Sequence, residues 1–208
     1  METIPSEMLR ERIMQVTEHR YYSPEEYLEL EEAAEYKSEY INGEIFPMAG
    51  GSTNHNQITL NFSTELNFAF KKLDYRVFMS DVRLWISRKH IYTYPDVMVV
   101  VGKPEYYNNR TDTITNPQII IEVLSESTKG YDRSGKFAAY RTIPTFTEYL
   151  LIDQTQISIE HYYKTASKRW SFQEYDESDE EIKLNSVDFQ ISLTDVYNKV
   201  QFPEINPE

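Results

Sequence analysis

Two uninterrupted apolar runs near the middle of the chain constrain its fold more than any other feature. Residues 97–101 read Val-Met-Val-Val-Val, and residues 119–124 read Ile-Ile-Ile-Glu-Val-Leu. Runs this rich in β-branched side chains are typical of strands that are buried on both faces of a sheet. Asp96 directly precedes the first run, and Glu122 lies inside the second. A buried carboxylate needs a cation, a metal ion or several hydrogen-bond donors, so two acids on neighbouring strands could share one divalent ion.

The rest of the pattern predicts an α/β (α+β) fold with one mixed central sheet flanked by helices. Ser23-Pro24-Glu25-Glu26 has the form of a capping box and predicts a helix that ends near residue 34. Asn42-Gly43 predicts the turn of a hairpin over residues 36–48. Thr53 or Asn54 is expected to cap a long helix that ends near residue 72, and further helices are expected at residues 131–141 and 193–200.

Domain organisation follows from the absence of repeats and linkers. We expect residues 1–20 to form a poorly ordered N-terminal arm and residues 21–208 to form a single domain, since 208 residues are enough for one sizeable core.

The composition narrows the class of protein. The chain has no cysteine, which excludes disulfides and cysteine zinc sites and fits a reducing compartment. No segment approaches the roughly 20 apolar residues of a membrane helix, and the first residues do not resemble a secretory signal. We therefore expect a cytoplasmic protein without membrane contact. The net charge of −13 weighs against a broad nucleic-acid-binding surface, but it leaves room for a local site.

A cation for the two acids is expected from a helix. A lysine two residues after Glu122 would lie on the same strand face, but Leu124 occupies that position. The next helix carries Asp132, Lys136 and Tyr140 at spacings of four residues, on one face. If this helix packs across the sheet, Lys136 can reach back to the acids, where its ammonium group would stabilise negative charge or position a nucleophile.

Several segments closely resemble the Uma-type endonuclease family. The resemblance spans roughly residues 22–200, and it is carried by YPDVMVVV (94–101), QIIIEVLSEST (118–128), YDRSGKFAAYRTIPTFTEYLLI (131–152), NGEIFPMAG (42–50) with the following His55, and SPEEYLEL (23–30). That family belongs to the restriction-endonuclease-like PD-(D/E)xK superfamily, whose members hydrolyse phosphodiesters with magnesium or a similar ion. The resemblance implies a restriction-endonuclease-like fold and a metal-dependent endonuclease whose substrate is DNA.

The same resemblance implies roles for five side chains. Asp96 and Glu122 correspond to metal ligands. Lys136 resembles the displaced lysine of the family, which replaces the lysine on the strand. Glu44 matches a recurrent acid of the family and would complete the site. His55 matches the histidine before the long helix.

The expected cofactor is Mg²⁺ or Mn²⁺. Magnesium prefers oxygen ligands and keeps several waters, so Asp96, Glu122 and the backbone carbonyl of Val123 suit it better than they suit zinc. The ion would activate a water molecule that attacks phosphorus in line, and the metal or Lys136 would offset the charge of the transition state.

Other interpretations of these residues stay open. Glu122 could form a structural ion pair with Lys136 or Arg133, and His55 could serve only as a helix cap. The negative charge and the missing strand lysine support an alternative function, a non-catalytic nucleic-acid-binding or homo-oligomeric assembly protein that retains the nuclease scaffold. The 17 tyrosines suit half-buried sheet surfaces or an interface, and we expect a homodimer.

Overall fold

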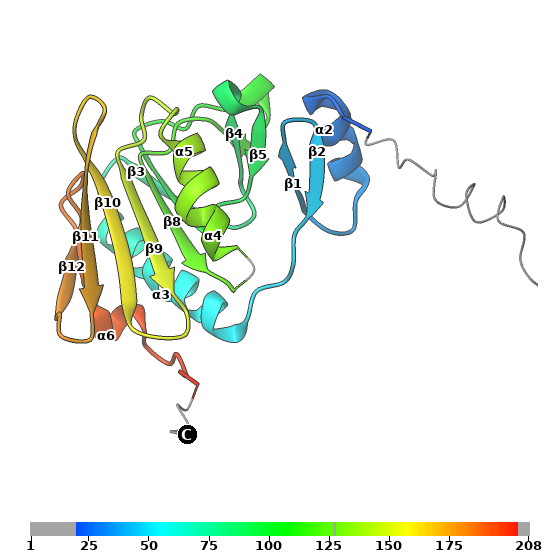
Figure 1. The fold of residues 1–208 in the computed structure, drawn as a ribbon. Coiled ribbons are helices and arrows are strands. Elements are labelled where there is room, and N and C mark those ends of the chain that lie inside the picture. Colours follow the sequence, from blue (N-terminus) through cyan, green and yellow to red (C-terminus); the bar gives the residue numbers. More distant parts are fainter. Residues whose placement is uncertain (1–19, 127, 204–208) are drawn as a thin grey trace, which may run out of the picture.

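A mixed six-stranded sheet forms the centre of the computed structural model, which describes residues 20–126 and 128–203 (Figure 1). The strand order is β11-β10-β9-β8-β6-β3. Only the pair β8–β9 is parallel in this sheet. The strands are Tyr75–Met79 (β3), Val97–Val101 (β6), Ile119–Leu124 (β8), Glu148–Asp153 (β9), Ser158–Ala166 (β10) and Arg169–Asp176 (β11). Apart from Arg20, the expected N-terminal arm lies outside the described residues.

A second sheet of five strands has the order β2-β1-β5-β4-β7. Its hairpin β1–β2 turns at Asn42-Gly43, both with positive φ, as this dipeptide favours. The mixed, helix-flanked, single-domain architecture expected from the sequence is confirmed, with the strands divided among three sheets. The strands of the two smaller sheets are Ser38–Ile41 (β1), Glu44–Pro47 (β2), Arg83–Ile86 (β4), Ile91–Thr93 (β5) and Thr113–Ile114 (β7), and Glu181–Lys183 (β12) with Gln190–Ser192 (β13).

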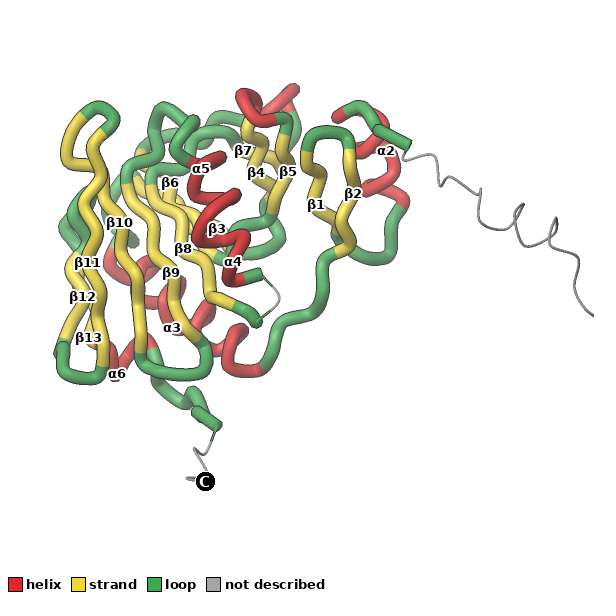
Figure 2. Tube along the Cα trace, viewed as in Figure 1, coloured by secondary structure: helices red, strands yellow, loops and turns green. Residues whose placement is uncertain are grey.

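Helices cover both faces of the six-stranded sheet (Figures 1 and 2). Helices α3 (Thr53–Ala69) and α6 (Leu193–Val196) pack on one face. A continuous helix packs on the other face and consists of α4 (Lys129–Tyr131), a π-helical turn η3 (Asp132–Lys136) and α5 (Phe137–Tyr140). Helix α2 (Pro24–Ala33) packs on the five-stranded sheet. Two 3₁₀ turns, η1 (Ser87–Lys89) and η2 (Tyr107–Asn109), lie in the connections.

Strand β8 divides its side chains between the two cores. Ile119, Ile121 and Val123 contact the core beneath α3, and Ile120 and Leu124 contact the core beneath α5. Because side chains alternate along a strand, Glu122 faces the helix Lys129–Tyr140. The fold therefore brings the one charged residue of β8 against the helix that carries Lys136.

The helix starts agree in part with expectation. Ser23 and Glu26 form the expected capping box of α2. In α3 the N-cap is Ser52, whose hydroxyl accepts the N–H of His55 at 3.1 Å, so the expectation of Thr53 or Asn54 is wrong by one or two residues. None of the helices in the two described ranges is long and apolar enough to span a bilayer.

Candidate active site

Asp96 and Glu122 lie opposite each other on neighbouring strands. The antiparallel register pairs Val97 with Ile121, so one step further along the two strands Asp96 faces Glu122. The backbone N–H of Asp96 donates to Oε2 of Glu122 at 3.3 Å, and the N–H of Val123 donates to Oδ2 of Asp96 at 2.8 Å. The two acids expected from the sequence are therefore adjacent, and backbone donors fix their geometry.

The structure brings Lys136 to these acids. Its Nζ donates to Oε1 of Glu122 at 3.1 Å and lies 3.0 Å from Oδ1 of Asp132 and 3.8 Å from a carboxylate oxygen of Glu39. Burial alone would lower the pKa of Lys136, but the charges of Glu122, Glu39 and Asp132 outweigh burial and raise the pKa well above its usual value. Lys136 is therefore a charged ammonium group enclosed by carboxylates.

Glu122 has two donors on one oxygen. Its Oε1 accepts the hydroxyl of Tyr140 at 2.6 Å in addition to Lys136. Burial raises the pKa of Glu122 to about 8, and the nearby charges of Asp96 and Asp132 add to the rise while Lys136 opposes it. Arg133, the other cation considered for Glu122, pairs with Glu160 instead.

His55 contacts the other acid. Its Nε2 lies 3.1 Å from Oδ2 of Asp96, and its backbone N–H is bound by the N-cap Ser52. Burial would lower the pKa of His55, but the hydrogen bond and the charge of Asp96 raise it overall. His55 thus lies at the start of α3 and also contacts Asp96. Its place beside the helix cap does not exclude a role in the site.

A π-helical turn sets the position of Lys136. The turn Asp132–Lys136 interrupts the helix, and such turns occur frequently at functional sites. Gly135 lies in this turn, and a Cβ atom placed there would come within 2.2 Å of Cε2 of Tyr131. The Tyr131 ring therefore packs directly on the glycine backbone, next to the residue that contacts Glu122.

Comparison with known proteins identifies the family. A sequence model for the Uma2 family, described as "Putative restriction endonuclease", matches residues 24–194. The chain belongs to the Uma2 family. Two relatives of this Uma2 chain come from Synechocystis. Uncharacterized protein sll1609 is 44% identical over 173 residues, which are 83% of this chain and 98% of the relative. Uncharacterized protein slr1290 is 36% identical over 180 residues, which are 86% of this chain and 93% of the relative.

A solved structure shares the fold of this Uma2 chain. It is described as the crystal structure of "a putative nuclease belonging to DUF820" from Anabaena variabilis, and it superposes with a TM-score of 0.70 over 86% of this chain and 99% of its own length. Sequence identity is 20%, so this likeness concerns the fold. The family and fold implied by the sequence motifs are confirmed, while the roles of the individual site residues stay predictions.

Glu39 is the site residue that sequence reasoning missed. It lies on β1, where its carboxylate accepts the hydroxyl of Thr93 and lies 3.8 Å from Nζ of Lys136. Glu44, the acid expected from the Uma2 hairpin, is half-buried on β2 opposite Ile41. Cross-strand partners share a face, so Glu44 is on the same face as Glu39 and nearer to the turn. Tyr40 packs in the aromatic core under α2, and alternation along β1 therefore turns Glu39 to the opposite face, toward Lys136.

The oxygen atoms around Asp96 fit a magnesium-type ion. The N–H of Val123 donates to Asp96, so the backbone of Val123 runs beside that carboxylate. Oδ1 of Asp96 takes part in none of the hydrogen bonds that join the described residues. Within the described ranges no three His, Asp or Glu side chains form a metal cage. The two carboxylates of Asp96 and Glu122 are oxygen ligands of the kind that magnesium accepts, with water completing its coordination.

Gln154 connects the strand that carries Glu122 with the helix that carries His55. Its side-chain amide donates to the carbonyl of Leu124 at 2.6 Å, and its Oε1 accepts the hydroxyl of Ser52. Leu124 follows Glu122 on β8, and Ser52 caps the helix that carries His55. Gln154 thus ties the end of β8 to the start of α3.

Proposed function

We propose that this protein is a metal-dependent endonuclease that hydrolyses phosphodiester bonds of DNA. The proposal rests on the contacts that bring Asp96, Glu122 and Lys136 together. The ammonium group of Lys136 and the backbone N–H of Asp96 both donate to the carboxylate of Glu122, and the backbone N–H of Val123 donates to the carboxylate of Asp96. Membership of the Uma2 family, described as putative restriction endonucleases, supports the same activity.

Asp96, Glu122 and the carbonyl of Val123 would hold the Mg²⁺ or Mn²⁺ ion. When bound, the ion would lower the pKa of a water molecule and offset charge on the phosphate. The N–H of Val123 and the imidazole of His55 orient the carboxylate of Asp96 through its Oδ2. The hydroxyl of Tyr140 orients Glu122 through Oε1.

Lys136 supplies positive charge for the reacting phosphate. Its ammonium group is desolvated and remains protonated at neutral pH because Glu122, Glu39 and Asp132 raise its pKa. Fixed charge in a site that excludes water stabilises a developing anion more strongly than charge in solvent does. We assign to Lys136 the stabilisation of negative charge on the phosphate oxygens during attack by water.

Cleavage of plasmid and single-stranded DNA in the presence of magnesium or manganese tests the proposal. Glu122→Gln and Asp96→Asn are expected to abolish cleavage and to weaken Mn²⁺ binding measured by calorimetry. Glu126→Gln is the matched control, because Glu126 is close in sequence and exposed, and among the described residues it pairs only with Lys129. Equal cleavage by the wild type and Glu122→Gln would contradict the proposal.

A non-catalytic role on the same scaffold is the second candidate. It is supported by the closure of Oε1 of Glu122 by Lys136 and Tyr140 and by the absence, among the described residues, of a three-residue metal cluster. It predicts no Mn²⁺ binding and DNA binding that survives neutralisation of both acids. The homodimer expected from the sequence also stays a prediction, and light scattering tests it.

A further inference from the structure

The described arginines fall into two groups. Five of them lie within ion-pair distance of a carboxylate: Arg20, Arg76, Arg83, Arg110 and Arg133. The remaining three, Arg88, Arg141 and Arg169, have no carboxylate of the described ranges at that distance. Exposed ion pairs contribute only about 0–1 kcal/mol to folding, so the unpaired state costs little.

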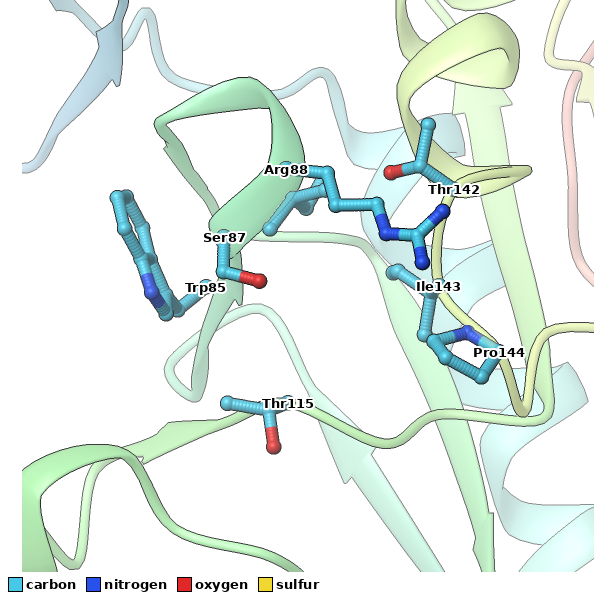
Figure 3. A pocket seen from close by; sticks show the side chains of 8 residues that line it. Trp85, Ser87, Arg88, Thr115, Thr142, Ile143 and Pro144 are labelled. Carbon is cyan, nitrogen blue, oxygen red and sulfur yellow. The ribbon is translucent and has the colours of Figure 1, made fainter.

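One of these arginines, Arg88, lines a small hollow whose other wall begins at the residue after Arg141. The hollow has a volume of about 110 Å³, room for several water molecules. Arg88 of η1 lines it together with Thr142, Ile143 and Pro144, which directly follow Arg141. Figure 3 shows the guanidinium group of Arg88 extended toward Thr142. The exposed turn η1 and the end of α5 are therefore neighbours, although more than 50 residues separate them in the sequence.

Aromatic contacts connect Arg141 with Trp170, the residue after Arg169. The guanidinium group of Arg141 lies 4.8 Å from the ring centre of Phe137, and Phe137 meets Trp170 edge to face at 5.3 Å. Trp170 follows Arg169 and pairs across the hairpin with Lys164. Figure 1 places the β10–β11 hairpin tip at the same end as η1. We call this set of cations the basic edge: Arg88, Lys89, Arg141, Lys164, Lys168 and Arg169.

We propose that the basic edge binds the phosphate backbone of the DNA duplex, as a surface separate from the carboxylate site. This inference rests on the proposed function. Guanidinium groups bind phosphate through paired, charge-assisted hydrogen bonds, and cations without carboxylate partners do not have to break an ion pair to do so. Six cations from η1, the end of α5 and the β10–β11 hairpin form the edge.

The edge is close enough to the carboxylate site for one duplex to reach both. Arg141 follows Lys136 by five residues in the same helix, a rise of about 8 Å along the axis. A duplex carries one negative charge for about every 1.7 Å of its axis. DNA whose backbone lies on the basic edge would therefore have further phosphates near Lys136. The edge would hold the duplex, although the net negative charge of the protein repels DNA.

Binding of a fluorescein-labelled duplex, followed by anisotropy over a series of salt concentrations, tests the basic edge. The full chain carrying Glu122→Gln is used in EDTA, so that neither cleavage nor metal binding contributes. Adding Arg88→Glu and Arg141→Glu is expected to weaken binding at least about tenfold at low salt. The slope of log K against log salt is expected to fall by about 2, because two phosphate contacts are lost. The pair Arg88→Gln and Arg141→Gln is expected to weaken binding in the same direction without introducing acids.

The matched control is the pair Lys71→Glu and Lys72→Glu. These exposed cations follow α3 and likewise have no carboxylate partner among the described residues, so the change in net charge is identical. Equal weakening by both Glu pairs, or absence of duplex binding by the parent chain, would overturn the basic edge. Cleavage that fails although binding depends on the edge contradicts the proposed function alone. Cleavage with binding that is independent of the edge contradicts this inference alone.

Discussion

The ammonium group of Lys136 lies 3.1 Å from Oε1 of Glu122, although Leu124 occupies the strand position from which a lysine would reach the same carboxylate. The π-helical turn Asp132–Lys136 delivers the cation from the opposite layer instead. Packing of this helix on the sheet therefore brings the positive charge of Lys136 beside the acids, and the position of Lys136 depends on that packing.

Replacing Lys136 is expected to destabilise the fold strongly. Lys136→Met removes the cation shared by Glu122, Asp132 and Glu39 and leaves buried carboxylates without compensation. The expected loss in the free energy of unfolding is about 3–5 kcal/mol, measured by urea denaturation. Lys129→Met, which breaks an exposed pair with Glu126, is expected to cost at most about 1 kcal/mol. Similar losses in the two variants would show that Lys136 is not held as a buried ion pair.

Two glycines of the same helix are expected to respond in opposite directions. Gly135→Ala places a methyl group 2.2 Å from the Tyr131 ring, so the helix or the ring must shift, at a cost of about 1–3 kcal/mol. Because Lys136 is the next residue, DNA cleavage is expected to fall as well. Gly130→Ala meets no atom within 4 Å and is expected to be neutral or to stabilise by up to about 1 kcal/mol. Thermal unfolding of both variants checks the difference; an unchanged Gly135→Ala protein would contradict the packing argument.

Local signals in the sequence predicted much of the framework. The Asn42-Gly43 turn, the capping box of Ser23 and the buried strand with Glu122 each depend on neighbouring residues, and each is found as expected. The spacing of four residues also placed Asp132, Lys136 and Tyr140 on one helical face, whereas the contact between Lys136 and Glu122 depended on how that helix packs on the sheet. These features could be read from the sequence because their physical cause lies within one helix, strand or turn.

The parts that sequence reasoning missed depend on contacts between distant segments. Glu39 faces the site because β1 pairs with β5 and so turns Tyr40 into the core under α2. The role of Gln154 depends on the turn between β9 and β10, which brings its side chain to Leu124 and Ser52. Nothing in the spacing of Glu39 or Gln154 indicates these partners.

Gln154 is expected to position the metal ligands. Gln154→Ala removes the bond to the carbonyl of Leu124 and the acceptor for Ser52, so the segment after Glu122 loses its anchor. Loss of such a supporting partner lowers metal affinity about 10–100-fold, and calorimetry with Mn²⁺ measures it. Gln118→Ala is the control, because the Gln118 amide also donates to a backbone carbonyl, that of Ser186, at the other end of β8. Equal Mn²⁺ affinity of Gln154→Ala and Gln118→Ala would show that Gln154 does not position the metal ligands.

Glu148 is expected to control stability in acid. It is fully buried, and its carboxylate accepts hydrogen bonds from His161, from the N–H of Asn185 and from the N–H and hydroxyl of Ser186. Burial alone would raise the pKa of Glu148, but these donors lower it below 4.5. A lowered pKa means that the unfolded chain binds the proton more readily, so the stabilisation is complete above pH 4.5 and is lost as the pH falls through the folded value.

Glu148→Gln tests this pH dependence. At neutral pH the variant is expected to lose about 3–5 kcal/mol of unfolding free energy, because the ionised acceptor of a buried hydrogen-bond cluster is gone. Below pH 4.5 the gap between the wild type and the variant is expected to narrow, because the wild-type carboxylate becomes protonated. Urea denaturation at a series of pH values measures both curves. Glu160→Gln, at a strand position outside this cluster, is the comparison. A difference in unfolding free energy between the wild type and Glu148→Gln that stays constant from pH 7 into acid would contradict the assignment of the stabilisation to an ionised Glu148.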